Sequence, residues 1–315
     1  MGAAFLFERR KAIRMFLEPL IAYPALFIGF TVAVGLLIGS FLNVVIYRVP
    51  IMMDKALRAE CAALADQGAD PGSTPAQDPR FNLMVPRSAC PACKAPITAM
   101  QNIPVVSWIA LGRKCASCKT PISIRYPLVE AATGILSGFI AWHYGYGGTA
   151  LAALAFTWFL IALTMIDFDT QYLPDQLTYP LLWLGLLGSL WHPVWGDGAA
   201  PVTPRDSIIG AAAGYLSLWS VYWAFKLLTG KEGMGYGDFK LFAALGAWMG
   251  WMMLLPIIIF ASAVGAIFGV VIMIRQRKGK DTQIAFGPFL AIAGWFALVG
   301  GNAMVERYLG LFAHD

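Results

Sequence analysis

Charge is scarce in this sequence. Only 13% of its 315 residues are Asp, Glu, Lys or Arg, and 58% are hydrophobic, whereas about a quarter of a soluble domain is charged. Long apolar runs separated by short polar loops indicate a protein that crosses a membrane several times, not a soluble enzyme. The net charge of +5 does not indicate a nucleic-acid partner, because the Lys and Arg residues lie beside apolar runs, where they set membrane topology.

Histidine is equally scarce. The three histidines are His143, His192 and His314, and the order of the apolar runs places all three on the outer side of the membrane. This argues against a Ser-His or Cys-His hydrolase acting from the cytoplasm, and the missing H-E-x-x-H pattern argues against a zinc protease. No small-residue cleavage site follows a short apolar core near the N-terminus, so we expect no removable signal peptide.

The apolar runs predict an all-α polytopic membrane protein with about eight transmembrane helices and a small cytoplasmic four-cysteine zinc domain. The expected spans are 20–47, 126–144, 149–166, 176–195, 206–228, 238–250, 251–274 and 286–308. They divide the chain into an interfacial segment (1–19), the first transmembrane helix (20–47), a cytoplasmic zinc-binding domain (48–125) and a seven-helix membrane domain (126–315). We detect no internal repeat. In the first span, Gly35 and Gly39 form a small-xxx-small pattern that lets helices approach closely.

Four of the five cysteines form two C-x-x-C pairs, Cys90 with Cys93 and Cys115 with Cys118, separated by 21 residues. Paired knuckles of this kind are typical of zinc sites. Four thiolates complete a tetrahedron and leave no open position, so the expected zinc is structural and not catalytic. An iron centre with the same ligands is the alternative. Thiols used in this way indicate a reducing compartment, and Cys61 is left over.

Eight spans place both termini on one side of the membrane. Most Lys and Arg residues face the cytoplasm if the zinc domain lies there, as the positive-inside rule requires. We therefore expect both termini on the outer side of the membrane. The zinc domain, the basic loop 275–280 and two acidic segments then face the cytoplasm.

The two acidic segments carry the candidate chemistry. Glycines alternate in Gly233-Met234-Gly235-Tyr236-Gly237 and then deliver Asp238 at the mouth of an apolar run, while Asp167 ends another run. Glycine permits a backbone that other residues do not take cheaply. An ionisable group at the edge of a span is costly, which favours a functional role. Two carboxylates that share one proton and one water have the chemistry of an aspartic protease.

The polar residues near the ends of these spans also allow other interpretations. Asp169 and Asp175 are alternative partners for the pair, and Asp175 is also placed to cap the next helix. Glu130, one turn into the second span, is either a functional acid or a buried partner of Arg125 or another base. Ser40 and Asn43 either join helices or belong to a site. The same carboxylates would suit cation binding, so an ion-coupled membrane transporter with a structural zinc domain is the alternative function.

The chain resembles the bacterial type IV prepilin peptidases, membrane aspartic proteases of the GxGD class. The resemblance covers nearly the whole chain and is carried by the cysteine quartet together with Gly39–Arg48, Tyr126–Glu130, Ile166–Asp175 and Gly233–Leu241. It implies a bifunctional enzyme with structural Zn²⁺ and S-adenosyl-L-methionine as cofactors. The substrates would be type IV prepilins and type II secretion pseudopilins in the lipid bilayer. Their short basic leader is cut after a glycine, and the new N-terminal residue, commonly phenylalanine, is N-methylated.

The resemblance also implies roles for particular residues. The matching motifs imply that Asp167 and Asp238 are the catalytic pair. They also imply that the zinc ligands are Cys90, Cys93, Cys115 and Cys118. Supporting candidates are Gly235, Gly237, Glu130, Asp169 and Asp175. No methyltransferase residue follows from the chemistry, although the zinc domain beside the first span overhangs the same interface.

Overall fold

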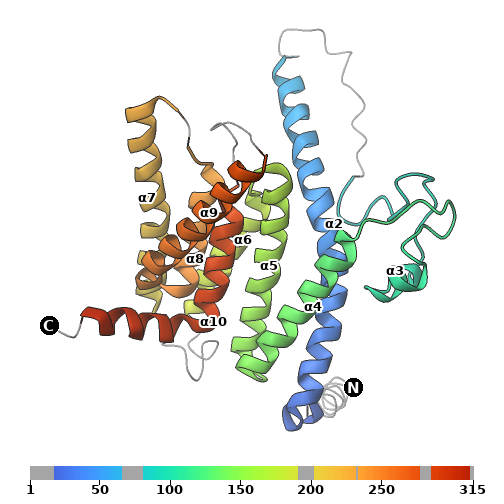
Figure 1. Cartoon of the computed structure of the whole chain (residues 1–315), viewed down its shortest axis with the longest axis horizontal. Helices are drawn as coiled ribbons and strands as arrows, with labels where there is room; N and C mark the ends of the chain where they lie inside the picture. Colours follow the sequence, from blue (N-terminus) through green and yellow to red (C-terminus); the bar gives the residue numbers. More distant parts are fainter. Residues whose placement is uncertain (1–17, 66–80, 191–201, 232, 277–284, 313–315) are drawn as a thin grey trace, which may run out of the picture. The chain divides into compact units, whose positions relative to one another are not determined.

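The computed structural model describes residues 18–65, 81–190, 202–231, 233–276 and 285–312 (Figure 1). Within these ranges the chain is helical, and its only extended pairings are two isolated bridges, so the predicted all-α class is confirmed. The described residues belong to two compact units: Leu36–Ala132, and Met1–Gly35 together with Thr133–Asp315. The expected interfacial segment 1–19 lies almost wholly outside the described residues, as do four of the six residues of the basic loop 275–280.

Helix α2 (Pro24–Ala65) begins in one unit and continues into the other. It does not end near Tyr47, where the first span was predicted to stop, because the residues after Pro50 are Met, Lys, Ala, Leu, Arg and Glu, which favour helix. Arg48 is buried beside this stretch. Its guanidinium donates to the carbonyl of Asn82 at 2.8 Å and to that of Pro86, which fixes the chain that leads into the cysteine knuckles.

The rest of the cysteine-containing unit consists of η2 (Met100–Asn102), α3 (Val106–Ala110) and the start of α4 (Arg125–Tyr144). Beyond this unit, α4 approaches the first part of α2 closely. A Cβ at Gly35 would lie 2.5 Å from the Ser137 hydroxyl. This confirms the close helix approach predicted for the small residues of the first span.

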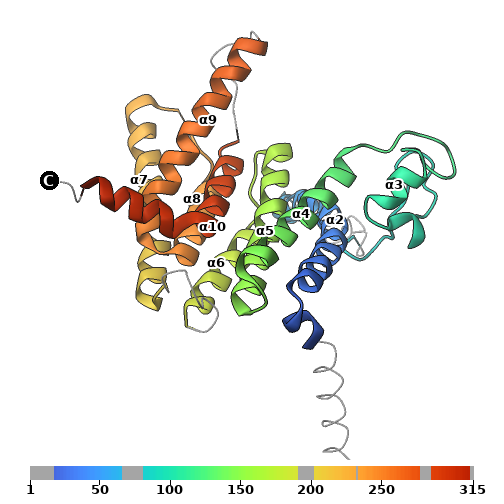
Figure 2. The same ribbon diagram turned by 60° about the horizontal axis from the view of Figure 1, so that its bottom comes forward.

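The larger unit contains a bundle of six α-helices. They are α5 (Gly148–Thr170), α6 (Asp175–Leu190), α7 (Pro204–Thr229), α8 (Tyr236–Met249), α9 (Leu254–Gln276) and α10 (Gly287–Phe312), with η4 (Trp251–Met253) between α8 and α9. Helix α8 packs against α6, α7, α9 and α10 and lies among them in both ribbon views (Figure 1, Figure 2). Ten of its 14 residues are buried, so this short helix is the centre of the unit.

Two glycines of α7 allow α8 to approach. A Cβ at Gly210 would overlap the backbone of Gly246, and one at Gly214 would lie 2.6 Å from the Phe242 carbonyl oxygen. The Ser207 hydroxyl donates to the Ala247 carbonyl at 2.7 Å along the same seam. Small residues and one hydroxyl group therefore hold α7 against α8 by close packing and a hydrogen bond, which is how helices associate inside a membrane.

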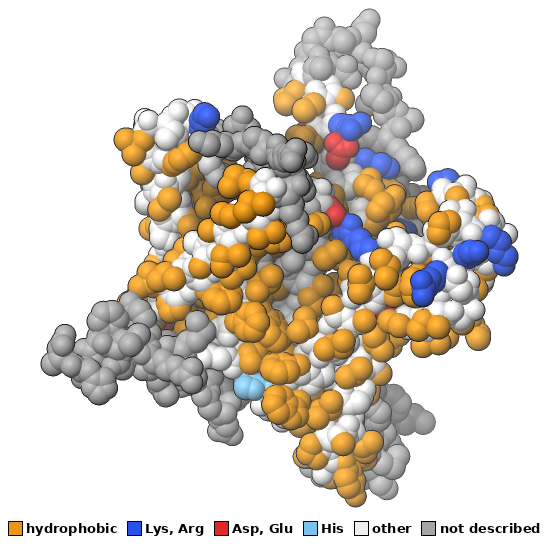
Figure 3. Space-filling model, in the orientation of Figure 1, with side chains coloured by type: hydrophobic (Ala, Val, Ile, Leu, Met, Phe, Trp, Pro, Cys, Tyr) orange, Lys and Arg blue, Asp and Glu red, His pale blue; other side chains and the backbone are white. Residues whose placement is uncertain are grey.

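Within the part of the chain that the structure describes, four helices are long and apolar enough to cross a membrane: Pro24–Leu64, Gly148–Thr170, Pro204–Thr229 and Trp251–Ile274. Hydrophobic side chains cover most of the visible surface of the described helices, whereas Lys and Arg gather around α3 (Figure 3). Helix α8 extends only about 21 Å at 1.5 Å per residue, less than the ~30 Å hydrocarbon core. The membrane class is thus supported, and the number of eight transmembrane helices stays a prediction.

Candidate active site

Asp167 and Asp238 come together although 70 residues separate them in sequence. Asp167 lies in the last turn of α5 and Asp238 in the first turn of α8, with 4% and 7% of their surfaces exposed. Both line one pocket of about 160 Å³ and interact electrostatically. Helix α5 thus continues beyond the predicted end of the span 149–166, to Thr170, and is ended by Gln171 in the left-handed conformation.

One oxygen of Asp167 lacks a well-formed hydrogen bond, although the backbone N–H of Gly287 interacts with this carboxylate. Its Oδ2 is buried and accepts no hydrogen bond of good geometry from the described residues. It faces the start of α10, where a Cβ at Gly287 would lie only 2.5 Å away. Leaving a buried acceptor unsatisfied costs about 1–3 kcal/mol, so this oxygen is suited to a proton, a water molecule or a substrate group.

Gly287 was not among the residues singled out from the sequence. The available signal was the order Phe286-Gly287-Pro288, because proline is favoured in the first turn of a helix. Sequence alone does not show that α10 begins beside α5, so it gives no reason to connect Gly287 with Asp167.

The glycines before Asp238 serve close packing. None of Gly233, Gly235 and Gly237 has a positive φ, so the unusual backbone expected for them is wrong. A Cβ at Gly237 would lie 2.7 Å from Cβ of Leu173, and one at Gly233 would lie 3.0 Å from the Phe225 ring. Glycine is needed because the segment 171–174 and α7 come too close for a side chain.

Gly237→Ala is expected to lower catalysis by about tenfold or more. The added methyl group meets Cβ and the backbone nitrogen of Leu173, which cannot rotate away, so the segment 171–174 must move and the two carboxylates separate. Overpacking of this kind costs ~1–3 kcal/mol, and each 1.36 kcal/mol is tenfold in rate. Gly235→Ala is the matched comparison, because the nearest atom to its added methyl group, Oδ2 of Asp238, would lie 3.9 Å away, an ordinary van der Waals contact. Equal cleavage rates of a peptide substrate by both variants would contradict this explanation.

The other two aspartates differ from the pair in burial and contacts. Asp169 is exposed and does not line the pocket. Asp175 is the first residue of α6 and lines the pocket, but its carboxylate accepts hydrogen bonds from Nζ of Lys240 at 2.6 and 2.8 Å. This ion pair joins α6 to α8, so Asp175 is engaged by Lys240 beyond the capping role predicted for it.

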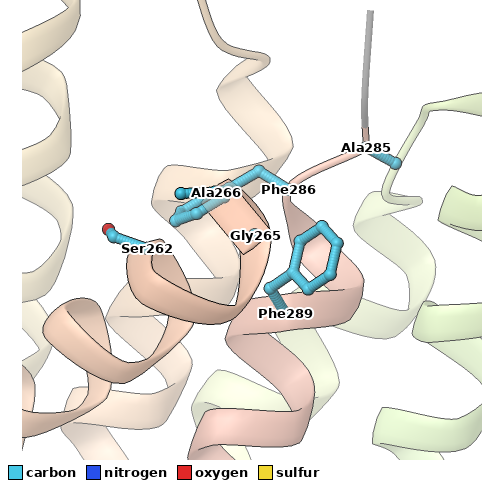
Figure 4. Close-up of a pocket in the computed structure, with 6 residues that line it drawn as sticks. All are labelled: Ser262, Gly265, Ala266, Ala285, Phe286 and Phe289. Atoms are coloured by element: carbon cyan, nitrogen blue, oxygen red, sulfur yellow. The ribbon is translucent and has the colours of Figure 1, made fainter. Parts of the chain in front are cut away.

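A second pocket of about 240 Å³ lies on α9 and the first turn of α10. Small residues of α9, including Gly265 and Ala266, face the rings of Phe286 and Phe289 across it (Figure 4). Ser262 is the one polar side chain among the described residues that line it, and these residues offer an apolar surface without an acid or a base.

The four cysteines of the predicted metal site converge. All four Sγ atoms lie within 4.8 Å of one another, and those of Cys90 and Cys118 are 3.8 Å apart. In a tetrahedral zinc site with Zn–S bonds of ~2.3 Å, the sulfur atoms lie about as far apart as those of Cys90 and Cys118 do here. The residues therefore fit a structural four-thiolate metal ion.

The two knuckles are copies of each other, so the expectation of no internal repeat is wrong. Cys-Pro-Ala-Cys-Lys-Ala-Pro and Cys-Ala-Ser-Cys-Lys-Thr-Pro begin at Cys90 and Cys115. In each copy the first cysteine N–H donates to a carbonyl five residues on at 2.9 Å, and the lysine has a φ near +60°. The repeat was visible in the sequence as C-x-x-C-K-x-P.

Thr120 prepares Cys118 as a ligand. Its hydroxyl oxygen lies 3.2 Å from Sγ of Cys118. The hydrogen bonds of the Thr120 side chain and backbone lower the pKa of Cys118 from 9.0 to about 6. The thiolate is thus favoured at neutral pH, which is the form that binds metal.

Glu130 is buried and holds a loop in place. Its Oε2 accepts the N–H of Val105 at 2.8 Å, and its carboxylate also interacts with the Ser40 hydroxyl. Val105 has a φ of +60°, which is strained for a β-branched residue. Asn43 donates to the Tyr126 carbonyl at 3.1 Å. Ser40 and Asn43 therefore connect α2 with α4, as the joining role predicted, and Glu130 fixes the loop before α3.

The fold and the site define a helical membrane protein with a buried pair of aspartates and a separate four-thiolate metal site. Two family models match the chain: the bacterial peptidase A24 N-terminal domain over residues 33–144 and the type IV leader peptidase family over residues 154–270. The chain therefore belongs to the type IV leader peptidase family.

Curated relatives carry the name prepilin leader peptidase/N-methyltransferase. The protein from Aeromonas salmonicida is 51% identical over 91% of this chain and 95% of its own length. Those from Stutzerimonas stutzeri and Pseudomonas aeruginosa are 49% and 50% identical, each over 93% of this chain and 97% of the relative. No solved structure matches. Since these relatives are peptidases, the transporter alternative is not supported.

Proposed function

We propose that the protein is a prepilin leader peptidase and N-methyltransferase of the bacterial inner membrane. It cuts the basic leader of type IV prepilins and type II secretion pseudopilins after a glycine at the cytoplasmic face. It then methylates the new N-terminal amine. The observation that carries the proposal is the buried pair formed by Asp167 and Asp238, which line one pocket together.

The pair explains the hydrolysis. Two adjacent buried carboxylates do not both ionise cheaply, so they share one proton. The ionised group takes a proton from a water molecule, which attacks the peptide carbonyl, while the protonated group donates to the carbonyl oxygen as negative charge develops. The two aspartates titrate together, so neither role belongs to one residue alone.

The substrate fits the expected topology. A prepilin joins a basic cytoplasmic leader to an apolar membrane helix, which puts the bond to be cut at the membrane surface. The aspartates lie at helix ends, where such a surface is expected. Exposed Asp169 adds negative charge that attracts the basic leader.

Methylation is assigned to the cysteine-containing unit. S-adenosyl-L-methionine, when bound, supplies the methyl group, and the enzyme must hold the new amine beside it. Zn²⁺ held by Cys90, Cys93, Cys115 and Cys118 would keep the two knuckles together. Glu130 and Arg48 would tie the knuckles to α2 and α4 through the loops that they anchor. Both termini would lie in the periplasm.

Mass spectrometry of a prepilin incubated with the purified protein in lipid tests both activities. Loss of the leader after glycine, with one added methyl group only when S-adenosylmethionine is present, is the expected result. Cleavage without methylation would remove the second activity from the proposal. An intact substrate with a folded, zinc-loaded enzyme would overturn it.

A further inference from the structure

Leu173 is the one buried apolar side chain among the residues that line the carboxylate pocket, and we call it the floor of this pocket. It is only 3% exposed, yet it lines the pocket together with both aspartates. Its Cδ1 would lie 3.4 Å from a Cβ at Gly237 and 3.1 Å from a Cβ at Gly287. Gly237 precedes Asp238, and Gly287 faces Oδ2 of Asp167. Leu173 thus lies between the two glycines that adjoin the two aspartates.

The backbone that carries Leu173 is held at both ends. Gln171, in the left-handed conformation, ends α5, and its N–H donates to the Asp167 carbonyl at 2.8 Å. On the other side, the Pro174 carbonyl accepts the N–H groups of Leu177 and Thr178, each at 3.0 Å. A floor fixed in this way does not withdraw easily from a bulky substrate.

The position of this floor restricts the substrate where the reaction occurs. A carbonyl carbon attacked between Asp167 and Asp238 brings its own α-carbon within one bond length of the pocket. Any side chain on that α-carbon must find room beside the carboxylates, where the isobutyl group of Leu173 already fills the gap between two glycines. Steric exclusion of this kind gives specificity by penalising the wrong substrate.

We infer that Leu173 sets the requirement for glycine immediately before the scissile bond. This inference rests on the proposed function, because it concerns the peptide that the pair cleaves. Leu173 acts as a specificity-determining residue: it takes no part in proton transfer and excludes a Cβ from the position next to the reacting carbonyl.

The test is a specificity switch. Two prepilins that differ only in glycine or alanine before the scissile bond are cleaved by the unaltered protein, by Leu173→Ala and by Leu173→Val. Leu173→Ala removes three carbon atoms, so the preference for glycine over alanine in kcat/KM should fall at least tenfold, with a smaller fall for Leu173→Val. A single methylene in a pocket changes discrimination by about 10–200-fold. Leu173→Met, which keeps the volume, should retain the preference.

The matched control is Leu181→Ala. Leu181 is fully buried in α6 and does not line the pocket, so this variant loses a comparable core side chain without opening the floor. Its preference for glycine should stay that of the unaltered protein. An unchanged preference in both Leu173→Ala and Leu173→Val, or an equal change in Leu181→Ala, would overturn the inference. Failure of the unaltered protein to cleave either prepilin would instead overturn the proposed function.

Discussion

Asp167→Asn and Asp238→Asn are each expected to lower leader cleavage by about 10²–10⁴-fold, the usual contribution of a positioned acid or base. Asparagine keeps the shape of the side chain but neither ionises nor shares a proton. Because both side chains are buried in one pocket, removing either carboxylate leaves the other with no group that can share its proton. The measurement is the single-turnover rate of leader loss from a purified prepilin in lipid.

The matched control for this prediction is Asp169→Asn. Asp169 lies only two residues after Asp167 but is exposed and outside the pocket, so its cleavage rate should stay within about threefold, the span of ~0.6 kcal/mol. Unchanged melting of all three variants would show that they fold. Normal processing by Asp167→Asn or Asp238→Asn would remove that residue from the pair.

Replacing both Cys90 and Cys93 by serine is expected to abolish metal binding and methylation while cleavage continues. Half of the four-thiolate site is lost, and structural zinc sites contribute about 10–16 kcal/mol to folding. The described segment 81–124 contains only two short helices besides the knuckles, so little else would hold it together. The aspartate pair belongs to the other unit, which explains why cleavage should survive.

Zinc content, limited proteolysis and methyl transfer to a precut pilin measure these effects. The doubly substituted protein should lose zinc, be cut by added protease within the segment 81–124, and fail to methylate. Cys61→Ser is the matched control, because Cys61 is an exposed thiol on α2 outside the cysteine cluster. Methylation that persists in the zinc-free protein would separate that activity from the knuckles.

Chemistry at the ends of apolar runs was the most predictable part of the molecule. Asp167, Asp238 and the cysteine quartet stand out because polar groups are costly beside a membrane span and because two C-x-x-C pairs have few other uses. The helical class and most helix boundaries follow from hydropathy. Helix α5 extends beyond its predicted end, so that Asp167 and Asp169 lie within its last turn.

Contacts between segments that are far apart in the chain could not be predicted from the sequence. Gly287 lies against Asp167 and Lys240 pairs with Asp175 only because α10, α8 and α6 are neighbours in space. The glycines near Asp238 were assigned to backbone freedom, whereas they are needed for contact with Leu173 and Phe225. Hydropathy likewise does not separate a helix that crosses the membrane from one buried by other helices, as α8 shows.

The contact between Gly287 and Asp167 also bears on how the protein is made. Both aspartates precede α10 in the chain, but the start of α10 lies directly against Oδ2 of Asp167. A nascent chain without residue 287 would leave the Asp167 carboxylate open on that side. We therefore expect the aspartate pair to be fully enclosed only after α10 has been synthesised and has packed against α5 and α8.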